Sequence, residues 1–274
     1  MEQQTVSVMN IEPVLRIMSY NICYDDRSNG ANAWVGRRDK VASIIGFHHP
    51  DLAGLQEVLR HQAVDLLRLL PGYECFGAST DGTGKGETVA IFYRPERLKL
   101  LQQGTFWLSE QPETPGSKGW DAMLPRIVTW GKFKDKITSK KIFQFNTHFD
   151  HKGRRAQLES GLLLLNRISE IAKDAPVIVT GDFNFTESAQ AYNLLTNDRG
   201  IGATLYDARY TSTHKHHGPG VTFCGFKVGN SPGERIDYIF TKNRVKIWRH
   251  GTLTDAWNGQ YPSDHLPLLA EAYV

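Results

Sequence analysis

Two oxygen-bearing side chains, Asp182 and Asn184, follow directly on the strand-forming residues of segment 176–184 (PVIVTGDFN). Residues two positions apart in an extended chain point to the same side, so this carboxylate and carboxamide could serve polar chemistry together at a sheet edge. The alternative is an ordinary turn, because Asp and Asn satisfy turn backbone groups. The segment alone favours neither interpretation, and the rest of the chain has to decide.

Other expected strands also end in, contain or closely follow polar side chains. These side chains belong to Asn21, Glu57, His148, Asp150, Asp237, Asp264 and His265. They would converge on one edge of the fold if the strands point the same way. One such coincidence is unremarkable, but five or six are hard to attribute to turns, so the pattern indicates a polar reaction site.

Glu57 is the best candidate for the principal ligand of a hard divalent cation such as Mg²⁺. These cations take oxygen ligands from one or two carboxylates and keep waters and substrate phosphate oxygens in their shell. Asn21 could add a neutral oxygen ligand. The alternatives are a helix N-terminal acid for Glu57 and a turn-capping side chain for Asn21.

His148 and His265 each lie close in sequence to an acid, which can hold an imidazole in one tautomer. Such a histidine acts as a general base or, when charged, stabilises an oxyanion. Asp237 could orient His265 in this way, or it could pair with Arg235 or Arg244 instead. A solvated loop is the alternative interpretation for His265 and the acid before it.

Phosphate chemistry also needs cationic groups. Arg37 begins an expected helix and Arg126 an expected strand, and arginine is well suited to contact phosphate through two N–H bonds at once. Arg38 and Lys40 are more typical of a solvated helix face. A further positive patch follows the His148 motif and consists of Lys152, Arg154 and Arg155.

Neither the clustered histidines nor the cysteines indicate a zinc site or a disulfide scaffold. The histidines, His214, His216 and His217, lack an HExxH or cysteine context and lie among Gly and Pro, so we interpret them as part of a surface loop. The three cysteines are far apart, odd in number and without CxxC spacing. They favour a reducing compartment such as the cytoplasm, although removal of a signal peptide would allow secretion.

The composition is that of an ordinary globular protein. The 274 residues are 40% hydrophobic and 22% charged, which is enough apolar material for a substantial core. The formal net charge of +3 does not identify a nucleic-acid-binding protein. No window approaches the ~20 apolar residues of a membrane span, and residues 1–13 hold no signal-peptide core. We expect a monomer.

Strands and helices are mixed along the chain, and several strand pairs are hairpins. Apolar residues at helical spacing predict helices at 37–49, 61–70, 154–173 and 188–195. Strand patterns occur at 14–21, 52–57, 73–77, 88–93, 98–106, 126–134, 141–147, 235–240, 245–251 and 268–273, besides the segment that opens at 176. We therefore predict a flexible leader at 1–13 and one α+β domain at 14–274, with two packed, mostly antiparallel sheets covered by helices.

Taken in order, the motifs resemble those of the endonuclease/exonuclease/phosphatase superfamily of metal-dependent phosphohydrolases. The resemblance covers nearly all of the chain through SYNI at 19–22, LQE at 55–57, NTHFD at 146–150, GDFN at 181–184, RIDY at 235–238 and SDH at 263–265. A single motif of this kind is weak, but all six in this order are a strong signal. Segments 33–37, 104–109 and 125–130 resemble compact bacterial-type members.

The resemblance implies a four-layered α/β sandwich, in which helices flank two central sheets and the site lies at one edge between them. Glu57 would be the main ligand of Mg²⁺ or Mn²⁺, with Asn21 and Asp264 near the metal. Asp182 would orient or deprotonate the attacking water, and Asn184 would bind the scissile phosphate.

The same resemblance gives roles to the histidines. His265 would contact a non-bridging phosphate oxygen while Asp237 fixes its imidazole, and His148 would donate to the phosphate as it becomes pentacovalent. The physical logic agrees, because a metal and an imidazolium neutralise developing charge while a carboxylate aims the nucleophile. The substrate-binding residues are then expected to be Arg37, Arg126 and Asp150.

We therefore predict a divalent-metal-dependent phosphohydrolase. We favour a nuclease-like phosphodiesterase that attacks the scissile phosphate of a nucleic acid or nucleotide-like diester with an activated water. The alternative among enzymes is a phosphomonoesterase, or a lipid phosphohydrolase acting on sphingomyelin or inositol phosphates. A binding module without turnover is disfavoured because every catalytic position of the motif set is filled.

Overall fold

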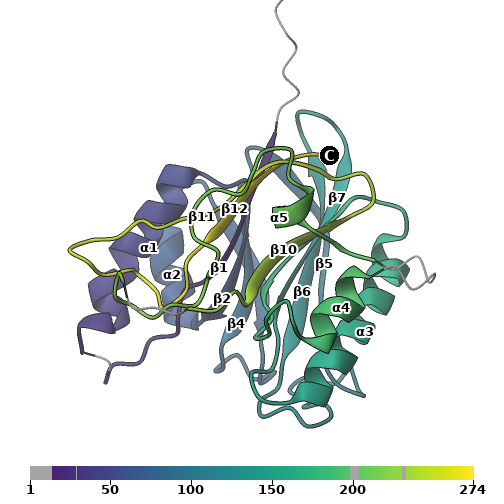
Figure 1. Ribbon diagram of the computed structural model, residues 1–274, viewed down its shortest axis with the longest axis horizontal. Helices are drawn as coiled ribbons and strands as arrows, with labels where there is room; N and C mark the ends of the chain where they lie inside the picture. Colours follow the sequence, from purple (N-terminus) through teal and green to yellow (C-terminus); the bar gives the residue numbers. More distant parts are fainter. Residues whose placement is uncertain (1–13, 29, 198–203, 230–232) are drawn as a thin grey trace, which may run out of the picture.

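The computed structural model describes residues 14–28, 30–197, 204–229 and 233–274. The leader expected at residues 1–13 lies outside these ranges, and the single domain expected at 14–274 stays a prediction. The described chain forms two six-stranded sheets that pack face to face, with helices on their outer sides (Figure 1).

The first sheet has the strand order β11-β12-β1-β2-β4-β3. Its members are β1 (Leu15–Asn21), β2 (Leu52–Val58), β3 (Glu74–Ser79), β4 (Thr88–Tyr93), β11 (Lys246–Thr252) and β12 (Leu268–Tyr273). The second sheet has the order β5-β6-β7-β8-β10-β9. Its members are β5 (Leu98–Trp107), β6 (Ile127–Asp135), β7 (Lys141–His148), β8 (Val177–Asp182), β9 (Tyr206–Asp207) and β10 (Asp237–Lys242).

Most neighbouring strands in both sheets are antiparallel, as predicted. The parallel pairs among the described strands are β1 with β2 and β7 with β8. Parallel strands end at the same edge, so each of these pairs delivers two strand ends to one place. The sequence did not predict the two-residue strand β9 or the four-residue helix α5 (Ala208–Thr211) beside it, because both are too short to show a period.

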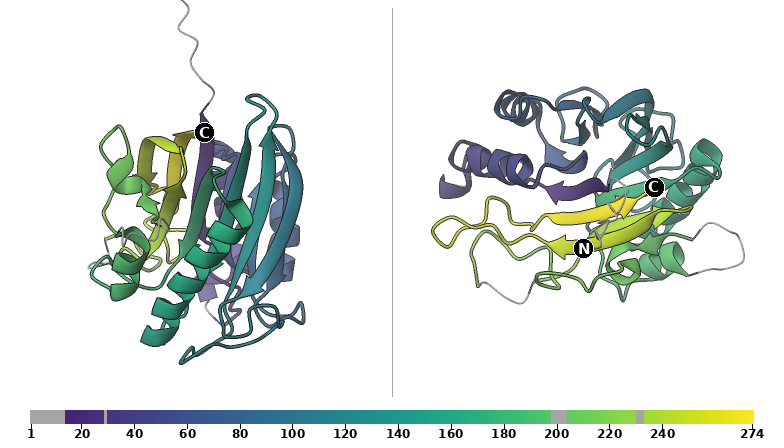
Figure 2. Two further views of the ribbon diagram at one scale, coloured as in Figure 1. Left: turned by 90° about the vertical axis from the view of Figure 1, so that its right-hand side faces the viewer. Right: turned by 90° about the horizontal axis from the view of Figure 1, so that it is seen from above.

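The helices cover the outer face of each sheet and complete the four layers, which confirms the predicted fold (Figure 2). Next to the first sheet lie α1 (Trp34–His48) and α2 (Arg60–Leu69), with the short 3₁₀ helix η1 (Gly30–Asn32) before them. Next to the second sheet lie α3 (Arg154–Ala172) and α4 (Gln190–Thr196). Helix α1 begins three residues earlier than predicted, because the carboxylate of Asp25 accepts a hydrogen bond from the backbone N–H of Trp34.

Three clusters of buried apolar side chains fill the spaces between the layers. One joins α1 and α2 to the first sheet, one joins α3 and α4 to the second sheet, and the third lies between the sheets. Successive residues of a central strand therefore enter different clusters, as Val177 and Ile178 do. This double burial explains the continuous apolar runs in the sequence.

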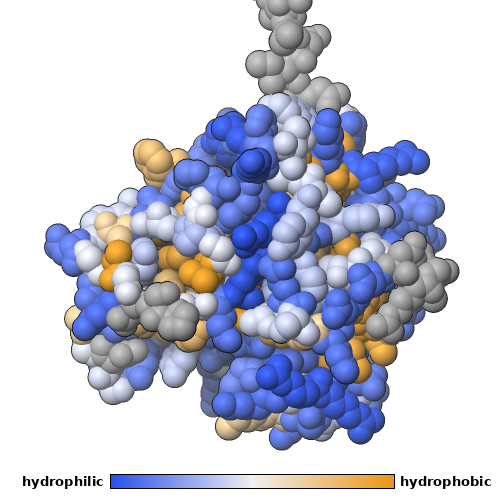
Figure 3. All heavy atoms as spheres, viewed as in Figure 1, coloured by the Kyte–Doolittle hydropathy of each residue, from blue (hydrophilic) through white to orange (hydrophobic). Residues whose placement is uncertain are grey.

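The outer surface is mainly hydrophilic on the face shown in Figure 3, with small separate groups of hydrophobic residues. Within the described residues, no helix combines the length and the apolar character that crossing a membrane requires.

Asn146 on β7 ties the second sheet to the first from the middle of the sandwich. Its side-chain amide donates to the carbonyls of Leu55 at 3.0 Å and Ala90 at 2.8 Å. Its side-chain oxygen accepts from Gln56 at 2.7 Å and from Thr180 at 3.0 Å. The carboxamide is fully buried and every hydrogen-bonding position on it is used, so it sets how the two sheets align.

A β-bulge in β2 follows directly on Leu55, whose carbonyl accepts a hydrogen bond from Asn146. The register between β2 and β4 shifts between Leu55 and Val58, which leaves Gln56 and Glu57 without regular partners in β4. Glu57 lies in this bulge with a φ of 61°, a left-handed conformation that is unusual for a residue other than glycine. The bulge therefore changes the direction of the Glu57 side chain, which lies at the edge of the sheet and lines a cleft there.

Replacing Asn146 by Ala should destabilise the protein, since two buried carbonyls and the side chains of Gln56 and Thr180 would each lose a partner. We expect the free energy of unfolding to fall by about 2–5 kcal/mol, because each buried polar group left unpaired costs about 1–3 kcal/mol. Urea denaturation measures this change. Asn193→Ala, on the exposed side of α4, is the matched control and should change it by less than about 0.5 kcal/mol. Equal stability of the two variants would contradict the role given to Asn146.

Candidate active site

Most of the predicted site residues meet where the strand ends of both sheets converge. Residue His148 pairs with Asp182 across the parallel strands β7 and β8, and Asp182 pairs with Asp237 across the antiparallel strands β8 and β10. The register thus places three functional side chains in one row of the second sheet. Asn21 at the end of β1 joins this row from the first sheet through its hydrogen bond to Asp182.

Of these residues, His148 and Asp182 line a cleft of about 700 Å³. Its lining includes eight residues with acidic or histidine side chains and three with arginine or lysine side chains. The lining residues are Tyr24, Glu57, Glu87, Leu124, Arg126, His148, His151, Lys152, Arg154, Asp182, Asn184, Phe223, Glu234, Ile236, Asp264 and His265. The cleft is therefore strongly polar and carries charges of both signs.

Asp182 is the central group of the site and is almost completely buried. One carboxylate oxygen accepts from the amide of Asn21 at 3.0 Å and lies 3.4 Å from Nε2 of His148 and 3.7 Å from Nε2 of His265. The other oxygen accepts from the backbone N–H of Asn184. Burial and then the charge of Asp237 raise the pKa of Asp182 to about 7. A carboxylate with such a pKa is suited to take a proton from water near neutral pH.

His265 and Asp237 form the dyad that the sequence could only suggest. Nδ1 of His265 lies 2.8 Å from a carboxylate oxygen of Asp237, so Nε2 points to the side where Asp182 and Asn21 lie. Burial lowers the pKa of His265, but the charges of Asp237 and Asp182 outweigh burial and raise the pKa well above its ordinary value. His265 is therefore positively charged at neutral pH.

His148 has the opposite electrostatic character. Burial, and then the positive charges of Arg126 and His265, hold the pKa of His148 well below its ordinary value. The imidazole is neutral near pH 7 and lies with Nε2 toward Asp182. A neutral imidazole in this position can donate one hydrogen bond without adding charge.

Glu57 is the carboxylate best placed to bind a cation. Asn21 donates to one of its oxygens at 3.0 Å, and the backbone N–H of Tyr24 donates to the other at 3.1 Å. Each oxygen keeps a free lone pair, and the half-buried side chain lines the cleft. Ligand atoms of Glu57, His148 and Asp182 lie within 4.8 Å of one another, which fits a divalent cation held mainly by carboxylate oxygens.

The structure assigns Asn21 a different position from the expected metal ligand. Its side-chain oxygen accepts from the backbone N–H of Cys23, so its amide group, and not its oxygen, faces Glu57 and Asp182. Asn21 therefore bridges and positions the two carboxylates. Asp264 lines the cleft, but it belongs to neither group of potential metal ligands found among the described residues.

Of the expected substrate-binding residues, Arg126 reaches the cleft and Arg37 does not line it. The guanidinium of Arg126 is nearly buried, and its Nε has no hydrogen-bond partner within the described chain. Arg37 instead donates to backbone carbonyls of the loop after β1, those of Ile22, Cys23 and Tyr24, and also to the carbonyl of Asn32. These carbonyls occupy donors that a phosphate would need, so the placement of Arg37 does not support the expected contact with phosphate.

Asp150 is likewise a loop-organising residue. Its carboxylate accepts backbone N–H groups of Met123, Leu124, Lys152 and Gly153, and it is almost inaccessible. These bonds hold the loop before β6 against the start of α3, and they leave no free donor or acceptor for direct contact with substrate. The placement of Asp150 therefore does not support the expected contact with substrate.

Asn184 lines the cleft, as expected for a residue beside the phosphate. It adopts a left-handed conformation with a φ of 53°, which Asn tolerates better than most residues. Its side-chain amide donates to the carbonyl of Phe149 at 2.9 Å. The side-chain orientation is thus fixed by the loop after β7.

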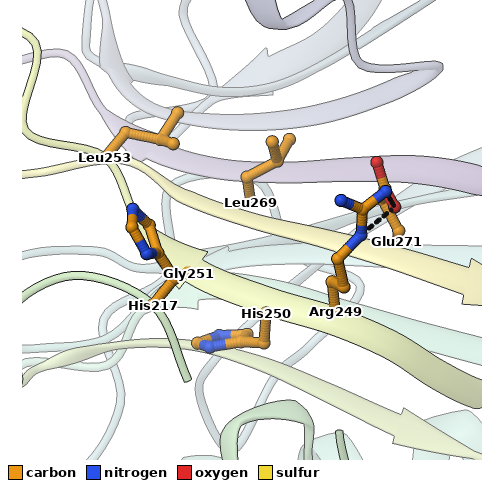
Figure 4. Close-up of a pocket in the computed structure, with 7 residues that line it drawn as sticks. All are labelled: His217, Arg249, His250, Gly251, Leu253, Leu269 and Glu271. Atoms are coloured by element: carbon orange, nitrogen blue, oxygen red, sulfur yellow. Dashed lines mark hydrogen bonds and ion pairs between the residues drawn. The ribbon is translucent and has the colours of Figure 1, made fainter. Parts of the chain in front are cut away.

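The three clustered histidines point to separate partners, and no described group of potential metal ligands contains them. The ring of His214 packs edge-on against Trp248, and Nδ1 of His216 lies 2.9 Å from Nδ1 of His250. His217 lines a separate, smaller pocket beside Leu253, Leu269 and the ion pair of Arg249 with Glu271 (Figure 4). This arrangement agrees with a loop at the surface.

Sequence reasoning missed Glu87, Glu234 and Phe223 in the cleft. The sequence analysis looked mainly for polar residues at the ends of strands. An antiparallel strand, however, begins at the edge where its neighbour ends, so residues before such a strand can also reach the site. Glu87 lies directly before β4 and Glu234 three residues before β10, so both lie where a strand starts at the edge that carries the site. Polar residues just before antiparallel strands were the signal that could have found them.

Comparison with known proteins identifies the family. The profile of the endonuclease/exonuclease/phosphatase family matches residues 18–265. The structure of a family protein from Bacteroides vulgatus is 38% identical, covers 96% of this chain and all of that chain, and has a TM-score of 0.90. A Bacteroides thetaiotaomicron mannosyl-6-phosphatase is 36% identical over 95% of this chain and all of that chain, with a TM-score of 0.88.

More distant relatives are larger. The 2',5'-phosphodiesterase 12 of Rattus norvegicus is 25% identical over 284 aligned positions, which cover 86% of this chain but only 45% of that protein. The family match and the two bacterial structures agree with the order of motifs in the sequence. The chain therefore belongs to the endonuclease/exonuclease/phosphatase family of phosphohydrolases and closely resembles its bacterial Bacteroides members.

Proposed function

We propose that this protein is a phosphomonoesterase that hydrolyses the phosphate ester of a small polyhydroxylated alcohol, such as a sugar phosphate. The sequence favoured a phosphodiesterase, but the comparisons favour its alternative. A mannosyl-6-phosphatase is similar over almost the whole chain, whereas the similarity to a phosphodiesterase is lower and covers less than half of that protein.

The placement of Asp182 is the observation that best supports a hydrolytic function. This buried carboxylate lies between a neutral imidazole, His148, and a charged one, His265, at the edge of an open cleft. A base and a cation beside one another are what attack of water on a phosphate requires. A binding module would have no need for this pair.

The charges on the cleft walls support a small monoester over a nucleic acid. A phosphate monoester can carry two negative charges, and Arg126, Lys152 and Arg154 line the cleft together with the charged His265. Glu87 and Glu234 also line it. Carboxylates on the walls would repel the continuous phosphate backbone of a polynucleotide, whereas they suit the hydroxyl groups of a polyol.

Different residues of the chain perform different parts of the proposed reaction. Asp182 takes a proton from the water whose oxygen forms the new bond to phosphorus. His265 and Arg126 stabilise the negative charge on the non-bridging oxygens, and His148 donates a hydrogen bond to the same group. The bond between phosphorus and the ester oxygen breaks, and the alcohol leaves with a proton from solvent. A Mg²⁺ or Mn²⁺ ion, for which Glu57 is the best-placed ligand, would supply further positive charge to stabilise the reacting phosphate.

A substrate panel tests the proposal. We expect mannose 6-phosphate and other hexose phosphates to be hydrolysed with higher kcat/KM than RNA, single- or double-stranded DNA or sphingomyelin in the presence of Mg²⁺. Asp182→Asn should lower kcat on the best monoester by about 10²–10⁴-fold, the usual contribution of a positioned general base. Asp174→Asn, an exposed acid after α3, should leave kcat unchanged. Preference for a diester would reject the monoesterase assignment, and full activity of Asp182→Asn would reject its role as base.

Removal of divalent cations should abolish activity, and Mg²⁺ or Mn²⁺ should restore it. Binding can be measured without turnover, because a cation that binds the folded state raises the melting temperature. We expect Mg²⁺ or Mn²⁺ to raise the melting temperature of the wild-type protein but not that of Glu57→Gln. Unchanged activity in chelator, or an equal shift in the variant, would contradict a cation at Glu57.

Asp237→Asn should lower the pKa of His265, because the neutral amide no longer stabilises the imidazolium while burial still opposes it. Titration of the His265 ring protons by nuclear magnetic resonance measures the change directly. Asp255→Asn removes the acid from a second pair, that with His48, and serves as the control that should leave His265 unaltered. If His265 titrates identically in Asp237→Asn and wild type, Asp237 does not keep it charged.

A further inference from the structure

Glu87 presents a carboxylate to the cleft that no other part of the described chain uses. It is half-buried, lines the cleft, and makes no side-chain hydrogen bond or ion pair with the described residues. Two other acids around the site have side-chain partners. Asp237 is bonded to His265, and Asp182 to Asn21.

The position of Glu87 is fixed by the backbone on both sides. Its carbonyl accepts from the backbone N–H of Thr80, which closes the loop before β4. The next residue, Thr88, pairs with Val58 directly after the bulge that carries Glu57. The pairing of Val58 with Thr88 thus places Glu57 and Glu87, the residues before them, at neighbouring points of the cleft.

The opposite wall near Glu87 comes from the second sheet. The hydroxyl of Thr129 on β6 donates to the carbonyl of Val89 on β4 at 2.7 Å, so the start of β6 lies over the start of β4. Arg126 precedes β6 and faces the same cleft. No ion pair within 4 Å joins Arg126 to Glu87 among the described residues, so a bound ligand can contact both charged groups.

The electrostatics of Glu87 favour a hydrogen-bond donor from outside the protein. An ionised carboxyl group in this setting lacks the donors that would stabilise it. Hydroxyl groups are suitable donors, and hydrogen bonds to charged groups are the stronger ones.

We propose that Glu87 is a specificity-determining residue that accepts a hydrogen bond from a hydroxyl group on the alcohol part of the substrate. The Arg126 side of the cleft holds the phosphate, and Glu87 selects esters whose leaving alcohol carries further hydroxyls. This inference rests on the proposed phosphomonoesterase function. It gives the protein a preference for polyol phosphates over simple alkyl phosphates of equal length.

The test compares two monoesters that differ in their hydroxyl groups, mannose 6-phosphate and n-hexyl phosphate. Glu87→Ala should lower kcat/KM for mannose 6-phosphate by about tenfold or more, as expected for a lost hydrogen bond to a charged group. The value for n-hexyl phosphate should stay the same or rise, because loss of a negative charge favours binding of any phosphate. Glu87→Gln keeps an acceptor oxygen and should lie between Ala and wild type. Glu96→Ala, an exposed glutamate away from the cleft, should change neither value.

The possible results distinguish failure of the hydroxyl contact at Glu87 from failure of the proposed phosphomonoesterase function. Equal losses on both esters would overturn the hydroxyl contact, because a structural or phosphate-binding role affects both alike. A wild-type protein that shows no preference, or a preference that survives in Glu87→Ala, would overturn the inference and leave the phosphomonoesterase function standing. If the wild type hydrolyses neither ester but cleaves a diester, the proposed function itself fails and the inference fails with it.

Discussion

The interaction on which the rest of this structure depends is the insertion of the Asn146 carboxamide between the two sheets. Its amide bonds carbonyls on β2 and β4, and its oxygen accepts from Gln56 and Thr180. Apolar contacts between sheets are non-directional and would tolerate sliding, whereas hydrogen bonds to four partners do not. Because Asn146 lies two residues before His148, the same contact that aligns the sheets also aligns the two halves of the site.

The site works by giving residues of the same type different surroundings. His265 lies between two acids and stays charged, while His148 lies beside Arg126 and stays neutral. Asp182 is raised toward neutrality by burial and by Asp237. Each environment follows from the register of β7, β8 and β10, since one step along a strand would turn these side chains to the opposite face.

The floor and the walls of the cleft are built from different kinds of residue. The floor holds the residues that the family motifs predict, whereas Glu87 and Glu234 come from the starts of antiparallel strands and belong to none of the six motifs. If Glu87 selects the leaving alcohol as proposed, the shared chemistry lies at the ends of some strands and the substrate preference at the starts of their antiparallel neighbours. This division is consistent with relatives of one fold that include both a sugar phosphatase and a phosphodiesterase.

The sequence by itself determined the family, the two-sheet sandwich and the residues of the site floor, because double burial leaves long apolar runs and strand ends carry the functional groups. It could not separate residues that act on substrate from residues that hold loops. Arg37 and Asp150 had the right chemistry, but backbone groups of distant segments occupy them, and the orientation of Asn21 depends on one backbone N–H. Only the tertiary structure decided these roles, since hydrogen-bond partners and burial are set by segments far apart in the chain.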